Sequence, residues 1–298
     1  MSWQMTAVGV YKRLTSKRQF GRPDGHEGLL RRRKTTSAPP ARALRGLDVS
    51  TSVVDGFDVH TVVAPGTPGG APVVVYLHGG AYVNELVVQH WQFVAEVASR
   101  LAVEVRVPIY GLAPQHDALE ALHLTATMLE RLRDEGRDVL LAGDSAGGGL
   151  ALITAQQSGH LLGDRLKGLS LMAPWLDLTM ANPEIPAVEE RDPWLARAAL
   201  HGVAASWAGT LDVHDPRVSP LFGPMDALPP VDLWIGDRDI TLPDARLLRD
   251  ALPDVTWHEL PGGIHVVPIL PVPEGRAART EMIGWMRERL GTEYTPGG

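Results

Sequence analysis

Apolar and polar positions alternate along this chain in a pattern that predicts strands and helices in turn. Short runs rich in Val and Leu are typical of buried strands and occupy residues 73–77, 103–107, 139–142, 169–172, 231–235 and 255–260. Stretches with apolar residues at helical spacing lie between them, at residues 91–101, 118–133, 146–157, 244–252 and 276–290. Strands that alternate with helices indicate a mostly parallel sheet covered on both faces, with function in the loops at the carboxyl ends of its strands.

The two flanks of this pattern are less regular. Residues 47–54 and 57–64 predict two strands joined at the turn Asp55-Gly56. The first forty or so residues predict an appendage, with a weak helix over 5–14 and a turn-rich stretch over 22–28. Residues 183–209, rich in Trp and Ala, predict a mostly helical insertion.

Composition adds exclusions to this picture. The chain has 298 residues, of which 44% are hydrophobic, so a large core can form without a metal or disulfide. It contains no cysteine, which excludes disulfides, thiolate metal sites and a cysteine nucleophile. No apolar run is long enough for a membrane span, and the N-terminal residues lack the features of a secretory signal. We therefore expect a cytoplasmic protein.

Charge is unevenly distributed. Residues 1–50 carry eleven Lys and Arg against three acidic residues, although the whole chain has a net charge of −7. A basic arm of this kind can meet a membrane surface or nucleic acid, but the sequence contains no nucleic-acid-binding motif. We expect no nucleic-acid partner and no membrane contact, and we expect the segment to fold against the acidic remainder of the chain.

Candidate chemistry begins at Gly143-Asp144-Ser145-Ala146-Gly147, which follows a predicted strand and precedes a predicted helix. A serine on a sharp strand-to-helix turn presents its hydroxyl at the edge of the sheet, and flanking glycines let neighbouring backbone approach closely. The pattern G-x-S-x-G is common by chance, but this context predicts that Ser145 is a nucleophile.

A second motif, His78-Gly79-Gly80-Ala81-Tyr82, follows the predicted strand 73–77. Glycines at the carboxyl end of a strand free their N–H groups to stabilise a developing oxyanion. We expect an oxyanion hole formed by Gly79, Gly80 and Ala146. Tyr82, Asn84, His90 and Asp144 are candidates for substrate contacts.

A nucleophilic serine needs a base, and the base needs a group that orients it. His265 follows the flexible stretch Pro261-Gly262-Gly263, whereas His258 lies inside a predicted strand, so His265 is the candidate base. Asp237 and Asp239 both follow the predicted strand 231–235, and their spacing cannot separate them.

Together these motifs resemble the hormone-sensitive-lipase-like group of α/β-hydrolases over roughly residues 70–290. The resemblance implies an α/β-hydrolase fold, with a mostly parallel sheet of about eight strands, helices on both faces and a helical cap. It places the acid at Asp239, an N-terminal cap segment at 1–45, and a catalytic domain at 46–298 with a cap insertion at about 183–209. Edge strands in this fold often pair subunits, so a homodimer is a further expectation of the resemblance.

The expected activity is that of a serine carboxylesterase acting on short- to medium-chain acyl esters through an acyl-enzyme, without a metal or cofactor. A lactone hydrolase would use the same machinery on a cyclic ester. A non-catalytic small-molecule receptor on the same fold is the alternative from another class, and an interfacial role for the basic segment is a further one.

Overall fold

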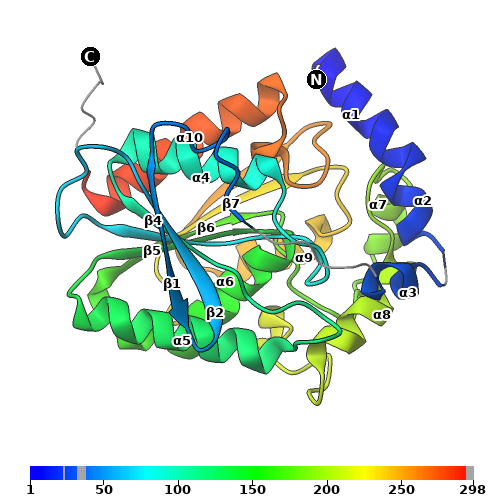
Figure 1. Cartoon of the computed structure of the whole chain (residues 1–298). Helices are drawn as coiled ribbons and strands as arrows, with labels where there is room; N and C mark the ends of the chain where they lie inside the picture. Colours follow the sequence, from blue (N-terminus) through cyan, green and yellow to red (C-terminus); the bar gives the residue numbers. More distant parts are fainter. Residues whose placement is uncertain (23, 32–37, 293–298) are drawn as a thin grey trace.

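A single eight-stranded sheet forms the centre of the computed structural model, which describes residues 1–22, 24–31 and 38–292 (Figure 1). The strand order is β1-β2-β4-β3-β5-β6-β7-β8. Strands β3 to β8 pair in parallel with their neighbours, apart from the antiparallel pair of β4 with β2. Strand β2 is also antiparallel to β1. The predicted mostly parallel sheet is therefore confirmed.

The strands have these bounds: β1 Asp48–Val54, β2 Phe57–Val63, β3 Val73–Leu77, β4 Glu104–Pro108, β5 Val139–Asp144, β6 Leu166–Met172, β7 Val231–Gly236 and β8 Val255–Leu260. The helices of the sheet region are α4 Val88–Leu101, α5 Ala118–Asp134, α6 Ser145–Ser158, α9 Leu242–Ala251 and α10 Pro273–Leu290. The remaining helices are α1 Trp3–Leu14, α2 Ser16–Phe20, α3 Gly25–Leu30, α7 Ile185–Glu189 and α8 Arg197–Ala208. Short 3₁₀ turns lie at Gly159–Leu161, Gly163–Arg165, Pro220–Phe222 and Val267–Ile269.

Helices cover both faces of the sheet, as a parallel sheet requires. Helices α4 and α10 lie on one face, and α5 and α6 lie on the other (Figure 1). Strands in such a layer bury successive residues on both sides, so every residue of β3 and β5 is buried. This explains why these strands appear in the sequence as continuous apolar runs rather than as alternating patterns.

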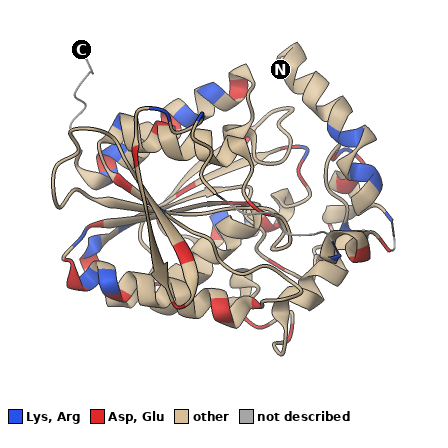
Figure 2. Ribbon diagram, in the orientation of Figure 1, with Lys and Arg blue, Asp and Glu red and all other residues tan. Residues whose placement is uncertain are grey.

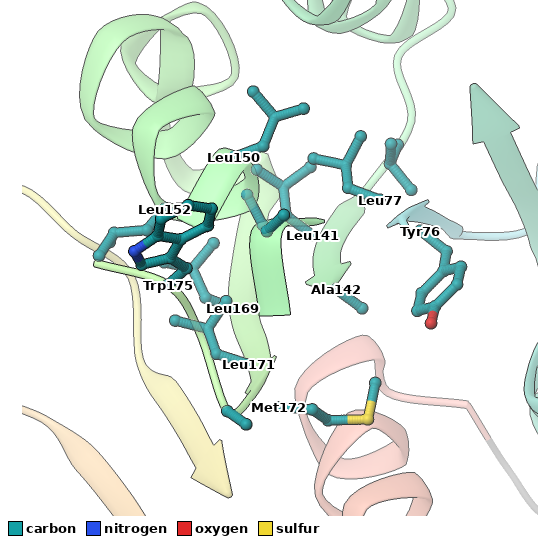
Figure 3. Close-up of a cluster of buried hydrophobic side chains, with 14 of the residues drawn as sticks. Tyr76, Leu77, Leu141, Ala142, Leu150, Leu152, Leu169, Leu171, Met172 and Trp175 are labelled. Atoms are coloured by element: carbon teal, nitrogen blue, oxygen red, sulfur yellow. The ribbon is translucent and has the colours of Figure 1, made fainter. Parts of the chain in front are cut away.

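The core beside β5, the strand that precedes Ser145, is drawn in Figure 3. Leu77 of β3, Leu141 of β5 and Leu171 of β6 have no exposed surface, and Leu150 of α6 packs in the same cluster. Each fully buried side chain of this size contributes roughly 1.5–3 kcal/mol relative to exposure. The carboxyl end of β5 therefore lies on a densely packed layer, which fixes the position of the residue that follows it.

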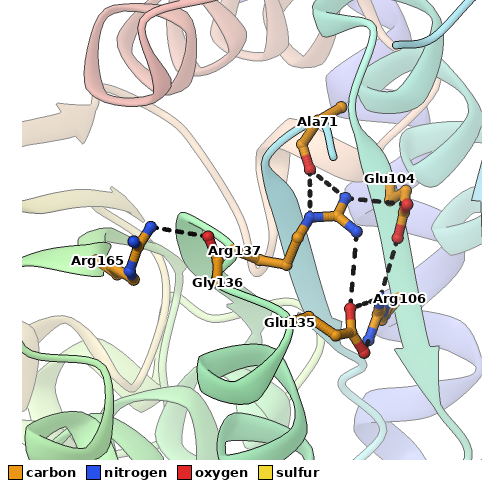
Figure 4. A network of polar contacts seen from close by, with 7 residues as sticks. All are labelled: Ala71, Glu104, Arg106, Glu135, Gly136, Arg137 and Arg165. Carbon is orange, nitrogen blue, oxygen red and sulfur yellow. Dashed lines mark hydrogen bonds and ion pairs between the residues drawn. The ribbon is translucent and has the colours of Figure 1, made fainter. Parts of the chain in front are cut away.

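A charged network joins the opposite, amino ends of the strands (Figure 4). The Arg137 guanidinium donates to the Ala71 carbonyl oxygen at 2.7 Å and pairs with Glu104 at 2.9 Å. Arg106 pairs with Glu135 at 2.6 Å and with Glu104 at 3.1 Å. Most of these residues lie before β3 and β5 or at the start of β4, and Arg106 lies in the middle of β4. The network therefore stabilises the sheet on the side of its amino ends.

Five helices outside the sheet layers gather at the other edge and are called here the covering helices: α1, α2, α3, α7 and α8. Helix α3 packs against α8, and α2 contacts both (Figure 1). Lys17 of α2 donates to the Glu189 carbonyl oxygen at 2.8 Å, so the basic N-terminal segment lies against the chain's own later residues.

One local prediction is wrong. Residues 22–28 were expected to form turns. Arg22 and Asp24 do lie in a bend and a turn, residue 23 is outside the described residues, and Gly25–Leu30 is the helix α3. The reason is close packing: a Cβ at Gly25 would lie 3.2 Å from the Ala199 Cβ of α8. The two helices approach so closely at this glycine that tertiary packing overrides its poor helix propensity.

Within the described residues, none of the helices combines the length and apolarity needed to cross a membrane. Strand β1 forms one edge of the sheet and is exposed along most of its length. Pairing of two copies through such an edge stays a prediction.

Candidate active site

Three side chains from distant parts of the sequence meet at the carboxyl edge of the sheet. The His265 Nε2 atom lies 2.8 Å from Ser145 Oγ, and its Nδ1 atom lies 2.7 Å from Asp239 Oδ2. Ser145 follows β5, Asp239 follows β7, and His265 follows β8. The order of these strands in the sheet brings the three loops to one place. The Ser145–His265–Asp239 hydrogen-bond chain is the arrangement in which a base can remove a serine proton.

The serine sits in a strained backbone conformation. Ser145 has a φ of 51°, in the left-handed region that residues with a side chain rarely adopt. Close packing below it leaves no room for larger neighbours: a Cβ at Gly147 would collide with the carbonyl oxygens of Leu77 and His78. The strand-to-helix turn thus holds Ser145 at the start of α6, with its hydroxyl toward His265.

Burial and charge act in opposite directions on His265. Burial lowers the pKa of its imidazole, but the Asp239 carboxylate raises the pKa by charge and by hydrogen bonding, and Asp192 and Asp144 add to this effect. The pKa of His265 is consequently raised above its usual value. The acid is fixed as well, since Asp239 Oδ1 accepts the Thr241 N–H and hydroxyl, each at 3.0 Å.

The loop after β3, residues 78–84, faces the serine. Gly80 has a φ of 126° and Ala81 has a φ of 53°, and both residues line the cavity in front of Ser145. No hydrogen bond from the N–H of Gly80 or Ala81 to another described residue is present. Ala146 lies in the first turn of α6, where N–H groups have no intrahelical acceptor.

A buried carboxylate supports this loop from behind. Asp144 Oδ1 accepts the Tyr76 hydroxyl at 2.6 Å and the Gly79 N–H at 2.8 Å, and Asp144 Oδ2 lies 3.4 Å from His90 Nε2. Burial raises the pKa of Asp144, but His90, Tyr76 and Gly79 together bring that pKa below its usual value. Asp144 is therefore an ionised structural group at neutral pH.

The cavity in front of Ser145 has a volume of about 650 Å³. Its floor includes Ser145, His265 and Gly80, and its walls include residues of α1 and α2. Apolar side chains such as Leu29 and Ile269 contribute much of the lining. A volume between roughly 300 and 1,000 Å³ suits a small organic ligand. Residues of α1, α2 and α3 thus border the cavity that contains the Ser145 hydroxyl.

Comparison with known proteins identifies the family. A family model described as alpha/beta hydrolase fold matches residues 74–269. The chain belongs to the alpha/beta-hydrolase family. An acetyl-hydrolase of Streptomyces hygroscopicus is 32% identical over 221 residues, which cover 69% of this chain and 72% of that protein. An esterase of Acinetobacter venetianus is 32% identical over 185 residues, and the match spans 60% of each chain.

The fold of a solved structure agrees with this membership. An esterase from the bacterial hormone-sensitive lipase family superposes with a TM-score of 0.76 at 24% identity, covering 92% of this chain and 99% of that one. The sequence motifs around Ser145 and Gly79 had predicted the alpha/beta-hydrolase fold.

Two of the residues predicted to surround the substrate have other positions in this hydrolase. Tyr82 is fully buried and stacks on Trp207, with ring centroids 4.1 Å apart, so it belongs to the core. The sequence had suggested that the Gly79 N–H donates to an oxyanion. In the structure this N–H donates to Asp144 instead, so it is not free for that role.

Asn84, His90 and Asp144 do line the cavity, but each is tied to the protein. Asn84 Nδ2 donates to the Gly80 carbonyl oxygen at 3.0 Å, and His90 Nδ1 accepts the Val87 N–H at 2.9 Å. The carboxylate of Asp144 is engaged as described above. The structure therefore gives these side chains a part in shaping the loop after β3, and contact with substrate stays a prediction.

Other residues of the site were not found from the sequence. Ala81 lines the cavity beside Gly80, and Trp194 lies edge-on to His265, with ring centroids 5.6 Å apart and an interplanar angle of 82°. Asp192 Oδ2 accepts the Ile240 N–H at 3.0 Å and so braces the loop that carries Asp239. Ala81 belongs to the motif at 78–82, where the glycines alone were singled out, and Trp194 shared the aromatic character of the insertion at 183–209. Asp192 lies in the same insertion and had no signal of its own. The described residues contain no group of His, Asp and Glu side chains arranged to hold a metal ion.

Proposed function

We propose that this hydrolase is a serine carboxylesterase of the hormone-sensitive-lipase-like group, acting on short- to medium-chain acyl esters. The observation that carries the proposal is the continuous hydrogen-bond chain from Ser145 through His265 to Asp239. The esterase and acetyl-hydrolase named above support the same reaction class.

In the proposed reaction, Ser145 Oγ attacks the ester carbonyl carbon while His265 Nε2 accepts the serine proton. Asp239 holds the imidazole with Nδ1 protonated and stabilises the imidazolium that forms. His265 then gives the proton to the leaving alkoxide, and an acyl-enzyme remains. A water molecule, deprotonated by His265, attacks the acyl-enzyme and releases the carboxylic acid and the free serine.

We assign the oxyanion hole to the N–H groups of Gly80, Ala81 and Ala146. Gly80 and Ala146 are kept from the sequence-based expectation, and Ala81 takes the place of Gly79. The N–H groups of Gly80 and Ala81 are not engaged by described residues, whereas the Gly79 N–H donates to Asp144. A lost donor in such a hole typically lowers kcat by ~10²–10³-fold. The covering helices act in this proposal as a cap, with α1–α3 as its N-terminal part and α7 and α8 as its inserted part.

The catalytic serine can be tested directly with p-nitrophenyl butyrate. We expect S145A to abolish turnover while its unfolding temperature stays close to that of the wild type, because the substitution removes only a hydroxyl. S158A is the matched control, since Ser158 ends the same helix and takes no part in the site. Full activity in S145A would refute the proposal.

A receptor without turnover, the alternative from another class, makes the opposite prediction for a covalent probe. A fluorophosphonate should modify Ser145 of the wild type and leave S145A unlabelled. Failure to label the wild type would favour the receptor.

A further inference from the structure

Lys12 is an isolated cation at the wall of the active-site cavity. It lies on α1 and lines the same cavity as Ser145. Its Nζ atom sits 3.4 Å from the centroid of the Trp194 ring, over the face of the indole. No carboxylate of a described residue pairs with it.

The neighbouring cations of α1 and α2 differ from Lys12 in this respect. Figure 2 shows basic residues on both helices, on the side of the molecule where the covering helices lie. Arg13 donates to the Glu190 carbonyl oxygen at 3.4 Å, and Lys17 donates to the Glu189 carbonyl oxygen at 2.8 Å. These contacts join the N-terminal helices to the loop around α7. Lys12 has no such acceptor and faces the cavity instead.

Partial burial makes the Lys12 ammonium a favourable partner for an anion. Burial lowers its pKa to about 8, so at pH 7 it is still mostly protonated but poorly hydrated. A cation in this condition gains more from an anionic partner than a fully solvated one does. The indole face compensates only part of the lost hydration, since a cation–π contact is worth roughly 0.5–2 kcal/mol.

The position of Trp194 shows which part of an ester would meet Lys12. The indole contacts the His265 imidazole by its edge, at a centroid distance of 5.6 Å, and carries Lys12 on its face. In ester hydrolysis the leaving oxygen takes its proton from His265, so the alcohol part of the substrate lies on the His265 side. The ammonium is therefore one aromatic ring away from the place where the alcohol leaves.

We propose that Lys12 and Trp194 form a subsite for a carboxylate carried by the alcohol part of the ester. The substrates of this class are acyl esters of hydroxy acids, with the indole packing against the alcohol skeleton and the ammonium pairing with its carboxylate. This inference rests on the proposed esterase function and adds a substrate class to it.

Two chromogenic esters that differ only in charge test the subsite. One is 3-butyryloxy-4-nitrobenzoate, and the other is 3-butyryloxy-4-nitrobenzamide, which has nearly the same shape and a similar leaving phenol. At pH 7 we expect the wild type to favour the benzoate by about tenfold in kcat/KM, the size of one charge-assisted contact. K12M should lose this preference by lowering kcat/KM for the benzoate and leaving that for the benzamide unchanged.

Two further variants separate the subsite from a structural role for Lys12. K12R should retain most of the preference for the benzoate, because it keeps the cation. R13M, which removes a cation from the same helix, should match the wild type on both esters. A K12M enzyme that loses activity equally on both esters, or on neither, would overturn the subsite and leave Lys12 as a clamp between α1 and Trp194.

The proposed esterase activity is measured separately with p-nitrophenyl butyrate, which carries no carboxylate. If the wild type hydrolyses this neutral ester but shows no preference for the benzoate, the subsite is refuted and the esterase assignment stands. If the wild type leaves p-nitrophenyl butyrate unchanged, the esterase assignment fails and the subsite fails with it.

Discussion

Both oxygens of the Asp239 carboxylate are engaged, an arrangement that supports the role proposed for this residue. Oδ1 accepts the N–H and hydroxyl of Thr241, which leaves Oδ2 as the oxygen that meets His265 Nδ1. Asp237, two residues earlier, turns the other way and accepts the Gly262 N–H at 2.8 Å. The two carboxylates therefore support the same site, one by orienting the imidazole and the other by holding the loop before it.

D239N and D237N form a matched pair that tests this difference. In D239N the amide oxygen stays with the Thr241 donors and the amide nitrogen faces His265 Nδ1, so the imidazole loses its acceptor. We expect kcat to fall by ~10³–10⁴-fold. D237N keeps an oxygen for the Gly262 N–H and should retain most of the activity. Assays with p-nitrophenyl butyrate measure kcat for both variants. Similar losses of kcat in D239N and D237N would contradict the assignment of Asp239 as the residue that orients His265.

Single residues were predictable where backbone chemistry is local. The glycines around Ser145 predicted a sharp strand-to-helix turn, and the flexible stretch before His265 singled out this histidine as the candidate base. The sequence could not show that the Gly79 N–H is occupied, because its acceptor, Asp144, is far away in the chain and near only in the fold. Nor could it show that Tyr82 stacks on Trp207 rather than facing the substrate. Both outcomes depend on contacts between separate elements.

At the scale of elements, helix α6 is the part that the site constrains most tightly. It starts at Ser145 and lies directly against β3. Gly147, in its first turn, therefore has no space for a side chain. Helix α10 also contains a glycine, Gly284, but no atom lies within 4 Å of the place where its Cβ would be. The same substitution should have opposite effects at these two positions.

G147A and G284A measure the constraint. A Cβ at Gly147 collides with backbone oxygens that cannot move aside, so we expect a loss of unfolding free energy of about 2 kcal/mol or more, together with lower activity. G284A relieves the low helix propensity of glycine without a clash and should add roughly 0.5–1 kcal/mol. Urea unfolding measures both changes. A G147A protein as stable as the wild type would show that the turn tolerates a side chain.

Elements with a strong local signal were predicted well, and those formed by packing were not. The ends of β3 and β8 agree with the apolar runs at 73–77 and 255–260. His258 lies within β8, as expected, and stacks on Trp234 with ring centroids 3.7 Å apart. Strand β6 begins at Leu166, before the predicted start at Leu169. Helix α3 was missed because its formation depends on the close approach of α8.

At the scale of the whole molecule, stability at different pH values reflects buried carboxyl groups as well as the site. Asp244 of α9 is almost fully buried and accepts one hydrogen bond, from Asn182 Nδ2 at 2.9 Å. Burial raises the pKa of Asp244 to about 7, and nearby Asp177 adds to the rise, against the lowering effect of Asn182. In an unfolded chain the same carboxyl group has a pKa of ~3.9.

D244N tests the consequence. Between about pH 4 and pH 7 the folded state holds the Asp244 proton more firmly than the unfolded state does, so this group's contribution to stability falls as pH rises and is fully lost above pH 7. D244N is neutral throughout, and we expect its Tm to exceed that of the wild type by at least ~2 °C at pH 8, with little difference near pH 4. D250N, at the exposed end of the same helix, should show no such gap. A gap of equal size at both pH values would contradict the burial argument.

The proposed catalytic groups and the proposed Lys12 subsite lie in different stretches of the polypeptide. The stretch matched by the family model begins at residue 74, whereas Lys12 and the rest of α1–α3 precede it. None of the three groups that would break an ester bond belongs to those first helices. Mutations in these helices can therefore change which esters bind without altering the three proposed catalytic residues. Exchanging helices α1–α3 between homologous hydrolases is therefore a direct way to obtain enzymes with new substrate preferences.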